Sequence, residues 1–158
     1  MKILLILMMV LLCGCGAKET FETISDEPVQ EVMAQPREIS VRLPDNAVAP
    51  VLESDAQQVY MSEYYEIVIE TLASGDLDAT VRSLCGYDKE NLTIMETQWD
   101  NVTRYDFVWA AAGEKGDRLG RGVVLDDGKH HYCMTVLRDA DETSQVVWRD
   151  VFASFTLL

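Results

Sequence analysis

The chain has 158 residues, room for one domain, and 48% of them are hydrophobic, which suits a packed core and not a disordered chain. Acidic residues outnumber basic ones by 27 to 13, giving a formal net charge of −14. We therefore expect no nucleic-acid partner, because phosphate neutralisation needs clustered Lys and Arg, and no attraction to anionic lipid headgroups.

The first 14 residues are typical of a signal peptide. Lys2 is followed by an apolar run over residues 3–12, which fits the core of a signal peptide. This run is shorter than the ~20 apolar residues that a membrane-spanning helix needs. No second apolar segment of this kind follows, so the sequence predicts export without a spanning helix.

The apolar run ends in Leu12-Cys13-Gly14-Cys15, which resembles the lipobox of bacterial lipoproteins. The resemblance implies lipidation of Cys15, cleavage after Gly14 and a location on the extracytoplasmic face of the cell membrane. Two acyl chains hold a protein stably on a bilayer, where one chain is marginal. The alternative is an ordinary secreted protein whose signal peptide ends near cysteines.

Residues 15–38 carry the cysteine and then six acidic residues, with Pro28 and Pro36 breaking any long helix. Their apolar residues keep no sustained period of 2 or 3.6. We interpret this stretch as a flexible acidic tether. A short helix over residues 28–34 is the alternative. The globular domain is then predicted over residues 39–158.

Alternating apolar and polar residues, the pattern of half-buried strands, recur along this domain. Strands are predicted at residues 39–43, 51–53, 59–61, 65–71, 92–97, 104–112, 119–126 and 129–137. Residues 65–71 also fit a helix, but their β-branched side chains favour a strand. In residues 104–112 the aromatic positions Tyr105, Phe107 and Trp109 point to one face.

Two helices are predicted. The first covers residues 77–85, between Asp76 as N-cap and Gly86 as terminator, with an apolar stripe on one side. The second covers about residues 141–153. Its buried side carries Trp148, Val151, Phe152 and Phe155.

Asp127-Gly128 is the strongest hairpin signal of the sequence. A two-residue loop at these positions places Asp126 opposite Lys129 and leaves His131 diagonal to Asp126. The same register gives one face that we expect to be buried. That face carries Leu119, Val123, Leu125, Tyr132, Met134 and Val136.

These elements predict an α+β domain, an antiparallel sheet flanked by helices. Several segments together resemble the PsbP-like domain, which is named for an extrinsic subunit of photosystem II and occurs in many envelope lipoproteins. The matching segments are 84–87, 104–109, 113–117, 125–128, 131–133 and 153–157. The resemblance covers about residues 39–158 and implies an α/β/α sandwich used as a binding or accessory module, without a common active site.

Few residues suggest chemistry. Adjacent strand residues point to opposite faces, so His130 and His131 do not chelate one metal, and we expect neither a metal nor a cofactor. His131 and Asp126 share a face, as a general base and its orienting carboxylate would. Tyr64 and Trp99 are the candidates for exposed, ligand-binding aromatics, because they sit at strand edges.

The sequence thus favours a membrane-anchored extracytoplasmic binding or accessory module, with an envelope protein as a partner and an unspecified small-molecule ligand. An envelope hydrolase using His131 and Asp126 is the alternative from another class. A two-lobed solute receptor is disfavoured, because ~120 residues make one lobe. Cys85 and Cys133 are expected to be separate buried thiols and not a disulfide.

Overall fold

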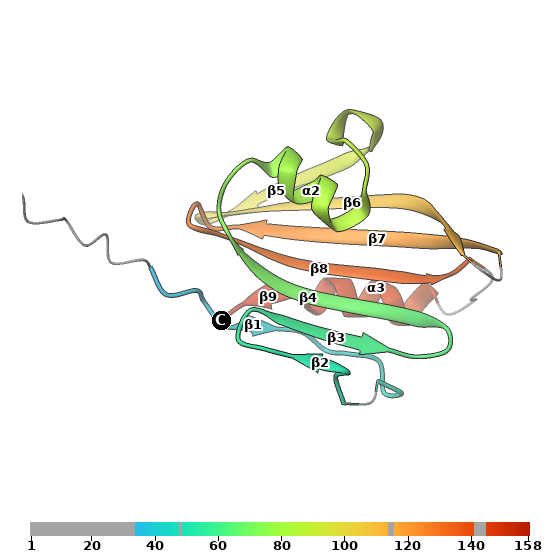
Figure 1. Ribbon diagram of the computed structural model, residues 1–158. Coiled ribbons are helices and arrows are strands. Elements are labelled where there is room, and N and C mark those ends of the chain that lie inside the picture. Colours follow the sequence, from blue (N-terminus) through green and yellow to red (C-terminus); the bar gives the residue numbers. More distant parts are fainter. Residues whose placement is uncertain (1–33, 48, 114–115, 141–144) are drawn as a thin grey trace, which may run out of the picture. The chain divides into compact units, whose positions relative to one another are not determined.

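Seven antiparallel strands form the main sheet, in the order β2-β3-β4-β8-β7-β6-β5 (Figure 1). The computed structural model describes residues 34–47, 49–113, 116–140 and 145–158. The strands are β2 (Leu52–Glu53), β3 (Gln57–Met61), β4 (Tyr65–Ala73), β5 (Ile94–Trp99), β6 (Val102–Gly113), β7 (Gly116–Asp126) and β8 (His130–Asp139). A separate antiparallel pair joins β1 (Ile39–Ser40) to β9 (Thr156–Leu157).

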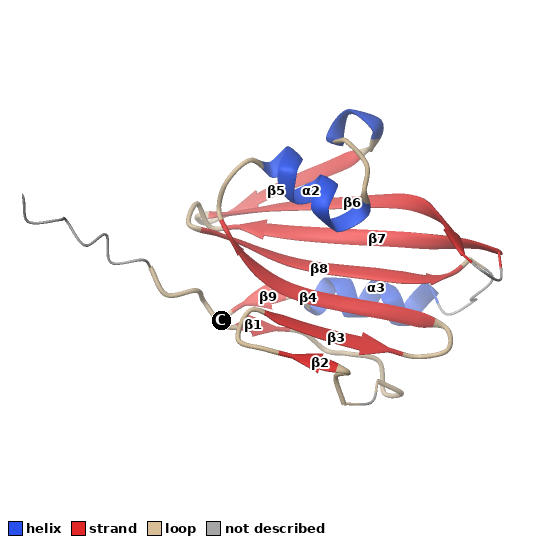
Figure 2. Cartoon of the chain, in the orientation of Figure 1, coloured by secondary structure: helices blue, strands red, loops and turns tan. Residues whose placement is uncertain are grey.

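Two α-helices pack against this sheet, as the α+β prediction requires (Figure 2). Helix α2 (Leu77–Cys85) has the predicted bounds. The Asp76 side chain accepts a hydrogen bond from the backbone N–H of Asp78 at 3.0 Å, and Gly86 ends the helix at a φ of +78°. Helix α3 (Gln145–Ser154) matches the predicted C-terminal helix but ends one residue later, and the first four predicted positions fall outside the described residues.

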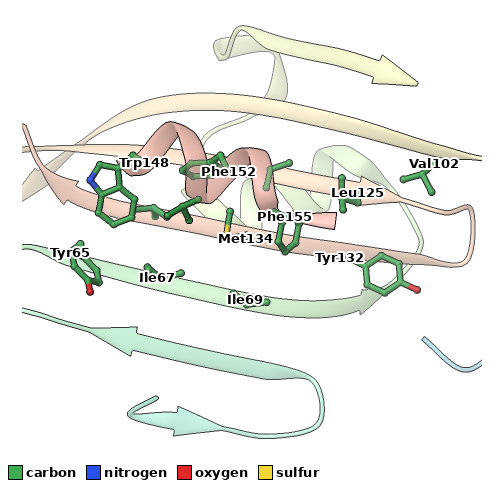
Figure 3. Close-up of a cluster of buried hydrophobic side chains, with 13 residues drawn as sticks. Tyr65, Ile67, Ile69, Val102, Leu125, Tyr132, Met134, Trp148, Phe152 and Phe155 are labelled. Atoms are coloured by element: carbon green, nitrogen blue, oxygen red, sulfur yellow. The ribbon is translucent and has the colours of Figure 1, made fainter. Parts of the chain in front are cut away.

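Each helix covers one face of the sheet, because strand alternation sends successive side chains to opposite sides. Val124 and Cys133 face α2 and pack with Phe107, Trp109 and Val81. The larger core faces α3, with Trp148 and Tyr65 at one end and Tyr132 at the other (Figure 3). Its buried members are Tyr65, Ile67, Ile69, Val102, Val123, Leu125, Tyr132, Met134, Val136, Trp148, Val151, Phe152 and Phe155.

The β7–β8 register differs from the prediction by two residues. Asp126 lies opposite His131, not Lys129, because the turn is centred on Gly128 and Lys129 instead of Asp127 and Gly128. Gly128 has a φ of +82°, which suits a turn that begins with glycine. A shift of the turn by one residue moves the register by two, so every side chain keeps its predicted face. Leu119 is the exception to predicted burial, since it stays partly exposed.

Several boundaries also differ. The strand predicted at 39–43 is only two residues long, and the one at 92–97 begins at Ile94, after a short 3-10 helix, η1 (Lys89–Asn91). Strand β9 was not predicted. The end of the predicted tether is bonded into the domain: Arg37 N–H donates to the Tyr132 hydroxyl at 2.8 Å, and Glu38 C=O accepts from Leu158 N–H at 2.9 Å. The domain accordingly begins before residue 39, because the compact unit that contains it starts at Ala34.

Candidate functional site

The two candidate aromatics do not form one site. Tyr64 precedes β4 and is exposed, whereas Trp99 ends β5, and three strands lie between β4 and β5 in the sheet. From the Tyr65–Arg138 pair to the Asp126–His131 pair, β8 advances seven residues, roughly 23 Å along the strand direction. The predicted lipidation residue, Cys15, lies outside the described residues.

Trp99 lines a cavity of about 370 Å³ near the C-terminal strand β9. Arg37, Asp100, Leu125 and Thr156 share this lining. The Arg37 Nε–H donates to the Leu158 carbonyl at 3.2 Å, so this cation already holds the C-terminal residue in place. The arrangement explains how residues near the start of the domain are joined to its C-terminal end, and it engages the cation of this cavity in a structural contact.

His131 and Asp126 come together more closely than the sequence register suggests. They are directly opposite across the β7–β8 pair, with 3.6 Å between Nε2 and Oδ2. The other ring nitrogen, Nδ1, is hydrogen-bonded to Thr80 Oγ1 of α2 at 2.8 Å. The donor in this bond depends on the tautomer of the ring. The Thr80 hydroxyl, the His131 imidazole and the Asp126 carboxylate therefore lie next to one another in space, in that order.

Burial limits what this trio can do. The His131 side chain is 1% exposed and Thr80 8%, because both lie between α2 and the sheet. A nucleophilic hydroxyl has to reach a substrate carbonyl, and this hydroxyl faces the interior. The contact does tie α2 to β8, since a buried imidazole without a partner would cost stability.

Cys85 and Cys133 carry free thiols, as expected, but only Cys133 is buried, whereas Cys85 is half-buried. Cys133 is buried in the core under α2, and burial raises the pKa of its thiol well above the ordinary value. Burial also raises the pKa of Cys85, whose thiol donates to the Val81 carbonyl at 3.2 Å. Neither is an activated nucleophile, because that role needs a lowered pKa.

A second concave surface, which we call the arginine groove, lies on the α3 side of the sheet. It has a volume of about 520 Å³. Its lining combines three arginines, Arg121, Arg138 and Arg149, with the apolar residues Val108, Leu119, Val136, Trp148 and Phe152. Among the residues that the structure describes, no acidic one belongs to this lining.

Strand pairing explains how the groove is assembled. Val108 of β6 is paired with Arg121 of β7, which is paired with Val136 of β8. Leu119 is paired with Arg138 in the neighbouring row. All five side chains point to the α3 face, so cations and aliphatic groups alternate across three adjacent strands.

Arg121 is held by two contacts. Its guanidinium carbon lies 4.1 Å from the centre of the Phe152 ring, and Nη2 donates to Asp106 Oδ1 at 3.2 Å. Asp106 also accepts from Arg104 Nε at 2.6 Å. Burial alone would raise the pKa of Asp106, but its bonds to Arg104 and Arg121 outweigh burial and lower it.

Arg104 links this network to α3. Its Nη2 donates to the Phe152 carbonyl at 3.0 Å and its Nη1 to the Phe155 carbonyl at 3.3 Å. These carbonyls lie at the C-terminal end of the helix, where backbone acceptors lack partners and a positive charge is favourable. The carboxylate of Asp106 therefore positions both the wall of the groove and the helix that covers it.

The sequence analysis missed this groove, although a signal for it exists. In the alternating patterns of 119–125 and 132–138, Arg121 and Arg138 occupy positions of the apolar face. Charged residues are seldom buried without a specific partner or role. Two inward-facing arginines on paired strands thus indicate a polar site within an otherwise apolar face of the sheet.

The described part of the chain offers neither a metal site nor a membrane-spanning helix: no three His, Cys, Asp or Glu side chains converge, and no helix is long and apolar enough. In comparisons with known proteins, no protein-family model matches the sequence and no curated protein gives a significant match.

Proposed function

We propose that the protein is a lipid-anchored binding module on the extracytoplasmic face of the cell membrane, with its ligand site in the arginine groove. The observation that carries the site is charge segregation. The chain holds 27 acidic and 13 basic residues, yet the described residues that line the groove include three arginines and no acid. Asp106 and Asp150 pair with Arg121 and Arg149 from outside the lining, and the N–H donors that remain on these guanidinium groups favour a binding role.

The anchor rests on the sequence. Leu12-Cys13-Gly14-Cys15 supports lipidation of Cys15, and the sequence between Cys15 and Ala34, where the compact domain begins, would supply the tether. The antiparallel sheet with its two helices agrees in outline with the PsbP-like resemblance, which supports an accessory role beside an envelope protein. No cofactor is part of this proposal.

The hydrolase alternative has one observation in its favour, the alignment of Thr80, His131 and Asp126. Against it stand the burial of the hydroxyl and the 3.6 Å separation of imidazole and carboxylate, which exceeds hydrogen-bond length. The groove, by contrast, is open to solvent, with Val108 and Leu119 exposed in it. The binding function is therefore the better supported of the two.

Site-specific photo-crosslinking in the producing cells tests the binding function. A benzophenone amino acid is placed at Leu119 of the inner strand β7, which lines the groove, or at Leu52, an exposed residue of the edge strand β2. We expect an adduct from position 119 and none from position 52. Equal labelling at the two positions, or none at either, would contradict a ligand site in the groove.

Mass spectrometry of the N-terminal peptide from the membrane fraction tests the anchor separately. The expected peptide begins at Cys15 and carries a diacylglyceryl group, and Cys15→Ser should abolish both the modification and membrane association. An unmodified peptide that begins at another residue would refute the lipoprotein assignment, whatever the groove binds.

A further inference from the structure

We propose that the ligand of the arginine groove is a small amphiphilic oxyanion, an apolar body with one carboxylate or phosphate head. This inference rests on the proposed binding function and names its ligand class. It follows from three features of the groove: the presentation of Arg121, the proximity of a second buried guanidinium, and the exposed aliphatic side chains between them.

The head group is assigned from Arg121. Stacking on Phe152 and the bond to Asp106 fix the plane of its guanidinium. That bond uses one of the five N–H donors of the group. A planar guanidinium with a fixed orientation matches the two oxygens of a carboxylate or phosphate, and little side-chain entropy is lost on binding.

Arg138 places a second positive charge beside the first. Arg121 is paired with Val136, so Arg138 is its diagonal neighbour on the same face, about 7–8 Å away at the backbone. Arg138 is buried, and Arg149 of α3 stands at the exposed rim of the groove. The Arg138 Nη1 donates to the Asp139 carbonyl at 3.4 Å, which orients this guanidinium beside the groove.

The apolar body is assigned from Val108 and Leu119. Both side chains are exposed although they point to the core side of the sheet. Each is the cross-strand partner of a groove arginine, Val108 of Arg121 and Leu119 of Arg138. An amphiphile can therefore cover an aliphatic side chain and meet a guanidinium within one strand spacing.

Overall charge and volume restrict the ligand further. The net charge of −14 repels polyanions such as nucleic acids or an anionic bilayer surface, and a single head group suffers least from this repulsion. The groove volume of about 520 Å³ falls within the range of pockets that bind small molecules.

The test measures displacement of a fluorescent amphiphilic anion, anilinonaphthalene sulfonate, from the chain beginning at residue 15 and carrying Cys15→Ser. Residues 34–158 form the compact unit, so removal of residues 1–14 leaves it whole. Competitors are decanoate, decyl phosphate and the neutral decanol, all below their micellar concentrations. We expect decanoate or decyl phosphate to bind at least tenfold more tightly than decanol, and the better of the two identifies the head group.

A matched pair of variants locates the binding. Val108→Glu places a carboxylate opposite Arg121, inside the groove, whereas Leu52→Glu makes the same change of charge on β2. Val108 is 52% exposed and Leu52 50%, so both variants should fold, which far-UV circular dichroism checks. The affinity for the anionic amphiphile should fall at least tenfold in Val108→Glu and less than twofold in Leu52→Glu.

Two outcomes would overturn the inference: decanol that binds as tightly as both anions, or Val108→Glu that binds like Leu52→Glu. Either result can coexist with a specific crosslink at position 119, and then only the ligand class is wrong. If position 119 gives no crosslink in the producing cells while the purified protein still binds the anionic amphiphile, the groove is not the site of the proposed function.

Discussion

Asp106→Asn should destabilise the domain far more than an ordinary surface substitution. The carboxylate is 13% exposed and accepts hydrogen bonds from Arg104 at 2.6 and 3.0 Å and from Arg121 at 3.2 Å. The amide cannot neutralise two guanidinium groups, and its NH₂ would face another donor. Breaking a buried ion pair costs about 3–5 kcal/mol, and the remaining exposure places this case near 3 kcal/mol.

Urea unfolding measures this loss. With a slope of about 1.5 kcal/mol per M, a loss of ~3 kcal/mol lowers the midpoint by roughly 2 M. Asp150→Asn is the control, because Asp150 also accepts from an arginine, Arg149, at 3.1 Å but is 57% exposed. An exposed pair of this kind contributes at most about 1 kcal/mol.

The effect should also depend on pH. The pKa of Asp106 is lowered in the folded protein, so its stabilisation is present above the ordinary value of 3.8 and is lost as the pH falls through the lower, folded-state pKa. The wild type and Asp106→Asn should therefore differ fully at pH 7 and converge in acid. Equal midpoints for Asp106→Asn and Asp150→Asn at pH 7 would refute the reasoning.

Two further substitutions test the core under α2. Gly120→Ala should cost about 1–3 kcal/mol, because the new Cβ would overlap the buried indole of Trp109, whereas Gly75→Ala, with no heavy atom near its Cβ, should be close to neutral in the same urea experiment. Thr80→Val should cost about 1–3 kcal/mol by leaving the His131 Nδ1 without its partner. Thr80→Ser keeps the hydroxyl and should lose clearly less; equal losses for the two variants would show that the hydrogen bond is not the cause.

The sequence was a good guide wherever a periodic pattern sets a face. Both faces of β6 and the buried faces of β7 and β8 follow from alternation, and α2 follows from its caps. Register was harder to predict, since it depends on whether Asp127 or Gly128 opens the turn. Backbone conformation decides this, and composition does not. The faces were right nevertheless, because a two-residue shift preserves alternation.

The site was predicted less well for a different reason. Tyr64 and Trp99 are candidates because of their positions at strand edges, but strand order places them at distant parts of the sheet. The groove depends on three strands and α3 meeting, a long-range arrangement that local patterns do not encode. Even so, the alternation of β7 and β8 places Arg121 and Arg138 at positions of the apolar face, and these two cations were a signal in the sequence for the arginine groove.

Amide chemical-shift mapping tests the central claim most directly. The ¹⁵N-labelled chain from residue 15, carrying Cys15→Ser, is titrated with decanoate, and the changes are followed residue by residue. The account predicts saturable shifts centred on Val108, Leu119, Arg121 and Val136, with little change around Trp99. Saturable shifts centred on the Trp99 cavity, or no saturable shifts at all, would contradict it.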